Sequence, residues 1–219
     1  MADVQSTAKS LSKEAMDVIV AYQDVPYFNN ARSSVRFGLR ALVGKGSPQE
    51  IADEALLYSL REKVDLKNLS LEQKKKFLVD HNIGIDCSGF AYYVLDAESQ
   101  ARGLGTLFHN LSYPFANSLF SHLGRMLRRR YVESADVSTF AHPSNSHEVK
   151  PRDVLPGDFF VRINKDRNHM MVVTEISGGQ ITIAHAEARP EDGRYGHGVR
   201  TETLLFSQLA LPIHRLNWF

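Results

Sequence analysis

The sequence has one cysteine, no long apolar run and almost no excess of either charge. A single cysteine, Cys87, among 219 residues excludes a disulfide within the chain and a zinc site built from several cysteines. No run of about 18 apolar residues occurs, so no membrane-spanning helix and no membrane partner are expected. The net charge of +1 at pH 7 gives no general reason to expect nucleic acid or an anionic membrane surface as a partner.

The beginning of the chain also lacks the uninterrupted apolar segment of a secretory signal. Lys9, Lys13, Glu14 and Asp17 introduce charges there, so we expect a cytoplasmic protein, with export by a route that needs no such signal left open. The composition, 43% hydrophobic and 23% charged, suits one soluble domain over residues 1–219. The oligomeric state is not indicated by the sequence.

Hydrophobic spacing and capping residues predict helices in the first half of the chain. One helix is expected over residues 10–22, from a stripe of apolar side chains. Ser47 and Ser70 each begin a capping box ahead of an apolar run, which predicts two further helix starts. Another amphipathic segment predicts a helix from about residue 87 to residue 100.

The middle of the chain is less regular. Residues 119–130 have helical apolar spacing and end in three arginines, which suit the negative end of a helix dipole. Residues 138–150 are polar and are expected to form a loop. We interpret about 1–80 as an N-terminal helical extension and about 101–150 as an insertion.

From Val154 onward the pattern changes to short β-rich runs. The predicted strands cover residues 159–163, 170–176, 180–186 and 213–218. Asp158 precedes the first of them and is expected to satisfy backbone donors in a turn rather than to act as an acid. Helices followed by an antiparallel sheet are typical of the α+β class.

Cys87 stands at the start of a predicted helix, within Asp86-Cys87-Ser88-Gly89-Phe90. Backbone N–H groups in the first turn of a helix have no intrahelical partner, and the dipole is positive there. This environment favours the thiolate, which is the nucleophilic form of cysteine. We therefore expect an activated nucleophile, with a buried packing cysteine as the alternative.

A cysteine nucleophile needs a base, usually an imidazole oriented by a third polar group. His169 opens one strand of the predicted hairpin, and His185 lies near the end of the other. A three-residue loop at 177–179 pairs Val173 with Ile183 and puts both histidines on one face of the sheet, within reach of each other. A two-residue loop separates them by one register step, unless a β-bulge compensates.

The ordered set resembles the NlpC/P60 family of papain-like cysteine peptidases. The motifs that carry the resemblance are Asp86-Cys87-Ser88-Gly89-Phe90, Leu155-Pro156-Gly157-Asp158, Asn168-His169-Met170 and Ile183-Ala184-His185-Ala186. The resemblance implies a papain-like α+β fold, in which N-terminal helices and the nucleophile helix pack on an antiparallel sheet. It also implies Cys87 as nucleophile, His169 as general base and acid, and His185 as the group that orients His169.

The resemblance further implies a cysteine peptidase or amidase that hydrolyses peptide or isopeptide bonds of murein-type peptides, without cofactor or metal. In family members that trim such peptides, the Asp and Ser beside the cysteine hold a free amine of the substrate, which here gives Asp86 and Ser88. The family's Tyr-x-Trp-Gly-Gly segment has its nearest counterpart in Tyr27-Phe28-Asn29-Asn30, without the tryptophan. Tyr27 is therefore the third candidate for substrate binding, although a long helical insert separates it from Cys87.

Several alternatives stay open at this point. The same scaffold suits an interbacterial amidase toxin, an acyltransferase or a deamidase, and a catalytically silent interaction domain if the inserts close the groove. His185-Ala186-Glu187 resembles one element of zinc deaminases, whose Pro-Cys-x-x-Cys partner is missing. No helix-spaced ligand pair supports a zinc site from the other candidates, His142, His147, His169 and His197.

Overall fold

The computed structural model describes residues 9–29, 40–114, 131–163, 168–208 and 210–219. Its helices are α1 (Lys13–Ala21), α2 (Pro48–Glu62), α3 (Leu71–Asp80), α4 (Cys87–Ala101), α5 (Leu107–Asn110), α7 (Tyr131–Ser134), α8 (Val137–Ala141) and α9 (Gly193–Gly196). Short 3-10 helices are η1 (Arg40–Val43), η2 (Leu66–Asn68), η3 (Pro151–Asp153), η4 (Pro190–Asp192) and η5 (Phe206–Gln208). The strands are β1 (Lys9–Ser10), β2 (Ser146–Glu148), β3 (Phe159–Arg162), β4 (His169–Ser177), β5 (Gln180–Glu187), β6 (Gly198–Leu205) and β7 (Ile213–Leu216).

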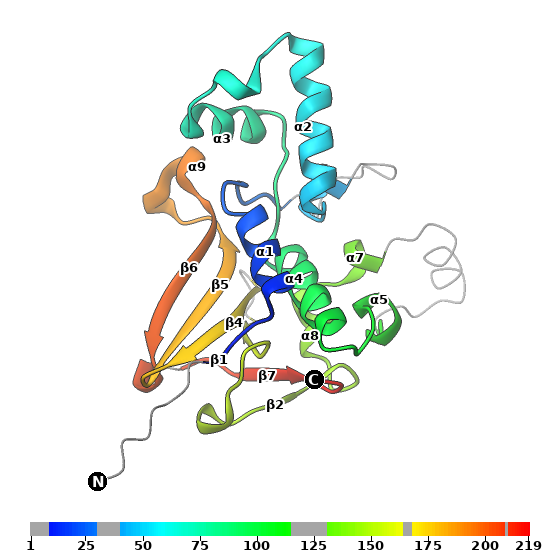
Figure 1. Cartoon of the computed structure of the whole chain (residues 1–219), viewed down its shortest axis with the longest axis vertical. Helices are drawn as coiled ribbons and strands as arrows, with labels where there is room; N and C mark the ends of the chain where they lie inside the picture. Colours follow the sequence, from blue (N-terminus) through cyan, green and yellow to red (C-terminus); the bar gives the residue numbers. More distant parts are fainter. Residues whose placement is uncertain (1–8, 30–39, 115–130, 164–167, 209) are drawn as a thin grey trace.

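The strands form one antiparallel sheet in the order β2-β7-β3-β4-β5-β6, and β1 pairs with β4 beside this path. This mixture of helices and antiparallel sheet confirms the predicted α+β class. In Figure 1, α2 and α3 lie together at one end of the molecule, and β2 and β7 lie at the other. Helices α1 and α4 lie between these ends, beside the sheet.

Both predicted capping boxes are present. The Ser47 hydroxyl accepts a hydrogen bond from the Glu50 backbone N–H, and the Glu50 carboxylate accepts one from the Ser47 backbone N–H. Ser70 and Gln73 make the same two hydrogen bonds. The first helix begins later than predicted, because Ser12 caps it and residues 9–10 pair with β4 instead.

The polar segment 138–150 is a loop only at residues 142–145 and 149–150; the prediction was wrong for residues 138–141, which are helical, and 146–148, which form a strand. The Asp136 carboxylate accepts from the Thr139 backbone N–H at 2.7 Å and caps α8. Ser146–Glu148 pairs with the last strand through backbone hydrogen bonds, which do not need apolar side chains. The helix predicted over 119–130 lies outside the described residues.

Besides the short strands β1 and β2, the long strand β6 was also missed. Strand β6 pairs along the whole of β5, from Gln180–Leu205 to Glu187–Gly198. Most of its side chains are partly or fully exposed, so it lacks the apolar alternation that marks a half-buried strand.

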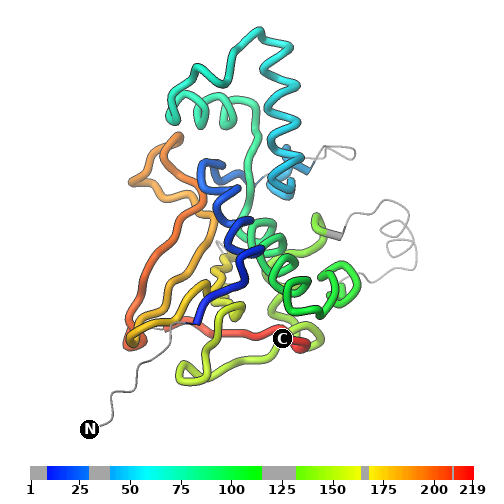
Figure 2. The backbone as a smooth tube through the Cα atoms, viewed as in Figure 1, coloured from blue at the N-terminus to red at the C-terminus, as the bar shows by residue number. Residues whose placement is uncertain are grey.

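The two faces of the sheet bury different side chains, because successive residues of a strand point to opposite sides. Met170, Val172 and Ala184 belong to the main core with residues of α1 and α4. Val173 and Ile183 belong to a second, smaller cluster on the opposite face. Figure 2 follows the chain and shows α1 beside α4, next to the central strands.

Asp158, at the entry to β3, has the turn role expected of it and a further ion pair. Its carboxylate accepts from the Leu155 backbone N–H at 2.7 Å and binds Arg215 of β7 through both oxygens, at 2.7 and 2.8 Å. The carboxylate is almost fully buried, so removal of its cation leaves an uncompensated charge.

Arg215→Met is expected to lower the free energy of unfolding by about 3 kcal/mol, because Asp158 would lose its buried cation. Urea unfolding of the purified variant measures this loss. The matched control is Arg152→Met, which removes an exposed pair with Asp153 and should cost less than about 1 kcal/mol. Equal losses in both variants would contradict the role assigned to the buried pair.

Candidate active site

Two earlier segments of the chain hold the start of α4. The backbone N–H of Asp86 donates to the Gly44 carbonyl at 2.9 Å, and Tyr27 forms a parallel β-bridge with Ile85. A Cβ on Gly89 would lie 2.6 Å from the same Gly44 carbonyl oxygen, so this close approach requires glycine. The aromatic loop around Tyr27 therefore reaches the site, although the intervening helices separate it in sequence.

Asp86 caps the helix, as its position before Cys87 indicates. Its Oδ1 accepts from the Gly89 backbone N–H at 2.6 Å, and its backbone is extended. Cys87 is thus the first residue of α4, which confirms the predicted helix start.

The β4–β5 hairpin has the predicted register, and it reaches it through a two-residue loop with a compensating β-bulge. Its loop is the two-residue Gly178-Gly179, and both glycines have positive φ, as a type I′ turn requires. A register shift between Val173 and Glu175 then leaves Thr174 as an extra residue and pairs Val173 with Ile183. The Thr174 carbonyl accepts from the N–H of Leu11, the residue after β1, at 2.9 Å, so the backbone oxygen at the bulge has a hydrogen-bond partner.

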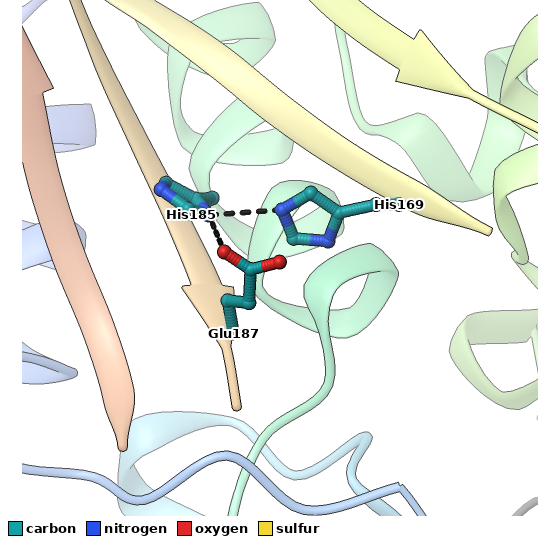
Figure 3. A group of neighbouring side chains, drawn as sticks. All are labelled: His169, His185 and Glu187. Atoms are coloured by element: carbon teal, nitrogen blue, oxygen red, sulfur yellow. Dashed lines mark hydrogen bonds and ion pairs between the residues drawn. The ribbon is translucent and has the colours of Figure 1, made fainter. Parts of the chain in front are cut away.

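The bulge brings the two histidines together. His169 Nε2 and His185 Nδ1 lie 2.9 Å apart, within hydrogen-bond distance, and each residue is 1% exposed (Figure 3). Their rings meet edge to face, with centroids 5.0 Å apart. In this hydrogen bond one of the two nitrogens donates and the other accepts, so the tautomer of one ring depends on that of the other.

Cys87 lies just beyond the last paired residues of the β4–β5 ladder. Its Sγ is 4.0 Å from the carbonyl oxygen of Asn168, and the backbone N–H groups of Met170 and Ser88 also face the sulfur. The sulfur therefore lies against the backbone on both sides of His169. The structure brings the candidate nucleophile to the start of the strand that carries the first histidine.

The thiolate expected at the helix start is not favoured in this closed site. Burial raises the pKa of Cys87 to about 12, and the neighbouring Asp86 carboxylate adds to the increase. Lys45 and the backbone N–H groups of Met170 and Ser88 lower the pKa but do not offset burial. Cys87, 4% exposed, is thus a neutral thiol at pH 7, contrary to the expectation that its place at the helix start favours the thiolate.

Two carboxylates flank His185. Glu187 Oε2 lies 3.9 Å from its Nδ1, and Glu202 Oε1 of β6 lies 3.7 Å from its Nε2 (Figure 3 shows the first). Arg189 binds both carboxylates and holds them in place. Burial lowers the pKa of His185 to about 4 despite these carboxylates, so the imidazole is neutral at pH 7.

The depressed pKa of His185 makes stability depend on pH. Between about pH 6.5 and 4 the unfolded chain binds a proton at this residue that the folded chain does not, so stability falls as the pH falls. His185→Asn should reduce that loss, between pH 7 and pH 4.5, by about 2 kcal/mol. Urea unfolding at both pH values measures it. Parallel pH dependence in the variant and the wild type would contradict the assignment.

The three candidates for substrate binding do not share one environment. Asp86 and Ser88 are buried and hydrogen-bonded to each other, with the Ser88 hydroxyl 3.2 Å from Asp86 Oδ1. Tyr27 is half-buried; its backbone N–H donates to His197 Nδ1 at 3.1 Å, and the two rings meet edge to face. A substrate can reach Asp86 or Ser88 only if their internal partners move.

His169, His185 and Glu187 offer three ligand atoms within 4.8 Å of one another, the one such group among the described residues. A metal ion there would replace the hydrogen bond between the histidines. It would also compete for Glu187 with Arg162 at 3.5 Å and Arg189 at 3.0 Å. The arginines already supply the positive charge that this carboxylate needs, so proton sharing accounts better for the histidine pair.

The sequence interpretation missed two residues of the site. Lys45 had no role in that interpretation, and Glu202 lies on strand β6, which was not predicted. Glu187, mentioned above only as part of the His185-Ala186-Glu187 element, is buried beside His185. The sequence around Lys45, a lysine between two glycines, carries no signal of burial. Only the tertiary structure shows that its ammonium group is enclosed.

Comparison of the chain with models of protein families, with curated proteins and with solved structures found no match. Within the described part of the chain, no helix combines the length and apolar character needed to cross a membrane.

Proposed function

We propose that this protein is a cysteine hydrolase, a peptidase or amidase of the NlpC/P60 type with a papain-like fold. The observation that carries the proposal is the 2.9 Å contact between His169 and His185, beside the strand start against which the Cys87 sulfur lies. The proposed substrate is a murein-type peptide, a choice that rests on the sequence resemblance alone.

The carboxylate beside His185 supports a defined proton arrangement. The proposal places the single proton of the neutral His185 ring on Nε2, the nitrogen that lies 3.7 Å from Glu202. Nδ1 of His185 then accepts from Nε2 of His169. In this tautomer Nδ1 of His169 carries no proton and can act as the base.

The proposed reaction is acyl transfer through a thioester. Cys87 Sγ attacks the amide carbonyl carbon while its proton passes to Nδ1 of His169, and backbone N–H groups at the start of α4 stabilise the oxyanion. The imidazolium then protonates the leaving amine as the carbon–nitrogen bond breaks. Water, deprotonated by His169, attacks the thioester and releases the acid and the thiol.

A second candidate, a catalytically silent interaction domain, is favoured by one observation. The Cys87 thiol is 4% exposed, and burial keeps it protonated at pH 7. A hydrolase with this site must open toward the substrate, whereas an interaction domain need not.

The two candidates are separated by incubating the purified protein with murein-derived peptides of defined composition and analysing the products by mass spectrometry. Cleavage of an amide or isopeptide bond, with incorporation of one ¹⁸O from labelled water into the new carboxyl group, is expected. Absence of cleavage across linear, branched and γ-linked peptides would reject the peptidase proposal and leave the interaction domain.

A further inference from the structure

Lys45 is a buried cation beside the candidate nucleophile. The residue is 7% exposed and lies on a segment that forms a β-bridge with Ile85, two residues before Cys87. Its ammonium group donates to the Ser88 hydroxyl at 2.6 Å and the Ala135 carbonyl at 3.0 Å, and lies 3.0 Å from Asp86 Oδ1. The three N–H bonds of an ammonium group thus have three oxygen partners.

These contacts surround Cys87 in the sequence, because Asp86 and Ser88 are its two neighbours. A buried carboxylate without a cation would be strongly destabilising, and Lys45 supplies that cation. The negative charge of Asp86 raises the pKa of Cys87, whereas the positive charge of Lys45 lowers it. Lys45 therefore offsets a charge that would otherwise oppose formation of the thiolate.

The same lysine connects three parts of the chain. It lies before α2, in the N-terminal extension, and binds two residues at the start of α4. Its third partner, Ala135, lies between α7 and α8 in the region interpreted as an insertion. The extension and the insertion therefore both contribute to the surroundings of the thiol.

We propose that Lys45 is a built-in cation of the cysteine site: it occupies the Asp86–Ser88 pair, offsets the negative charge beside Cys87 and leaves no place there for a positively charged group of the substrate. Its role is positioning and electrostatic, since it acts on Cys87 through Asp86 and Ser88. The statement about the substrate rests on the proposed function, whereas the statement about the thiol does not.

The test of the electrostatic role is the rate of Cys87 alkylation by iodoacetamide between pH 7 and pH 9. The charged groups that act on the thiol are Asp86, the cap of its helix, and Lys45. His169 and its partner His185 are the nearest titratable groups on the sheet, where the sulfur lies 4.0 Å from the carbonyl of Asn168, next to His169 in the chain. Lys45→Met should slow alkylation about tenfold at fixed pH, and Asp86→Asn, which can still cap the helix, should accelerate it about tenfold. The double variant should return to within about twofold of the wild type.

The opposite signs exclude a merely structural effect, because loosening of the helix start would change both single variants in the same direction. Equal-direction changes, or no change in Asp86→Asn, would overturn the proposal. If Lys45→Met does not fold, Asp86→Asn decides by its direction alone: slower or unchanged alkylation would overturn the proposal. Lys74→Met, an exposed lysine of α3, is the matched control and should leave the rate unchanged.

The substrate statement is tested with pairs of peptides that differ only in acetylation of the terminal amine. Cleavage rates within about threefold of each other are expected, since Lys45 already fills the cation site. A preference of more than tenfold for the free amine would overturn this part. If neither peptide is cleaved, the hydrolase proposal fails and the statement about the substrate is rejected with it, while the alkylation rates still decide the role of Lys45.

Discussion

Cys87→Ala is expected to lower peptide hydrolysis about 10³-fold or more, to the level of the uncatalysed reaction in the assay. Cys87 is the only cysteine of the chain, and its sulfur is the atom that forms the proposed thioester. Alanine occupies less space at the same helix position, so Asp86 still caps α4 and the fold is retained. The cost to stability should be about 1 kcal/mol, which corresponds to the lost burial of the sulfur.

Hydrolysis and thermal unfolding of the variant are measured on the same preparation. Cys87→Ser is a useful companion, because it keeps a polar group of similar shape but cannot form a thiolate. Loss of activity with little change in melting temperature supports the nucleophile. Unfolding of Cys87→Ala under conditions where the wild type is folded would instead support a packing role for the cysteine.

His169→Ala should lower hydrolysis about 10²- to 10⁴-fold, the range typical of a general acid–base residue. The thiol is neutral at pH 7 because burial raises its pKa, so the attacking sulfur depends on a nearby base to remove its proton. The same dependence predicts slower alkylation of Cys87 by iodoacetamide in the variant. Peptide cleavage and alkylation rates, both measured at pH 7, provide the two readouts.

His147→Ala is the matched control for this variant, because His147 is exposed and its Nδ1 lies 3.0 Å from Asn217 Oδ1, away from the site. Its hydrolysis should stay within about twofold of the wild type. Cleavage by His169→Ala at the wild-type rate would remove the imidazole from the mechanism, whatever the behaviour of Cys87→Ala.

Capping and hydrophobic periodicity located most of the helices around the site. Serines at positions 47 and 70 marked two helix starts, because a side-chain cap needs only residues within one turn, and apolar spacing marked a third at Cys87. The strands of the β4–β5 hairpin were also recognisable, since their apolar runs flank two adjacent glycines. Strand β6 was not, because its partly exposed side chains carry little apolar pattern.

The histidine pair was a conditional prediction of the sequence. Residue spacing alone allowed two registers, one of which puts His169 and His185 on opposite faces of the sheet. The bulge at Thr174 selects the other register, and the backbone of Leu11, more than half the chain away, satisfies it. The local pattern therefore identified the two histidines, whereas the register that brings them together includes a bulge whose backbone is bound by a distant segment of the chain.

Residue types and their order predicted that Cys87 starts a helix and that His169 and His185 lie on two neighbouring strands, because helix starts, strand runs and turns depend on neighbours in the chain. The charge state around them depended on the tertiary structure, since burial and long-range ion pairs set pKa values. Packing made Cys87 a protonated thiol, brought Lys45 onto Asp86 and Ser88, and put Glu202 behind His185. The sequence spacing of Lys45 from Asp86, or of Glu202 from His185, matches no local pattern from which these contacts could be predicted.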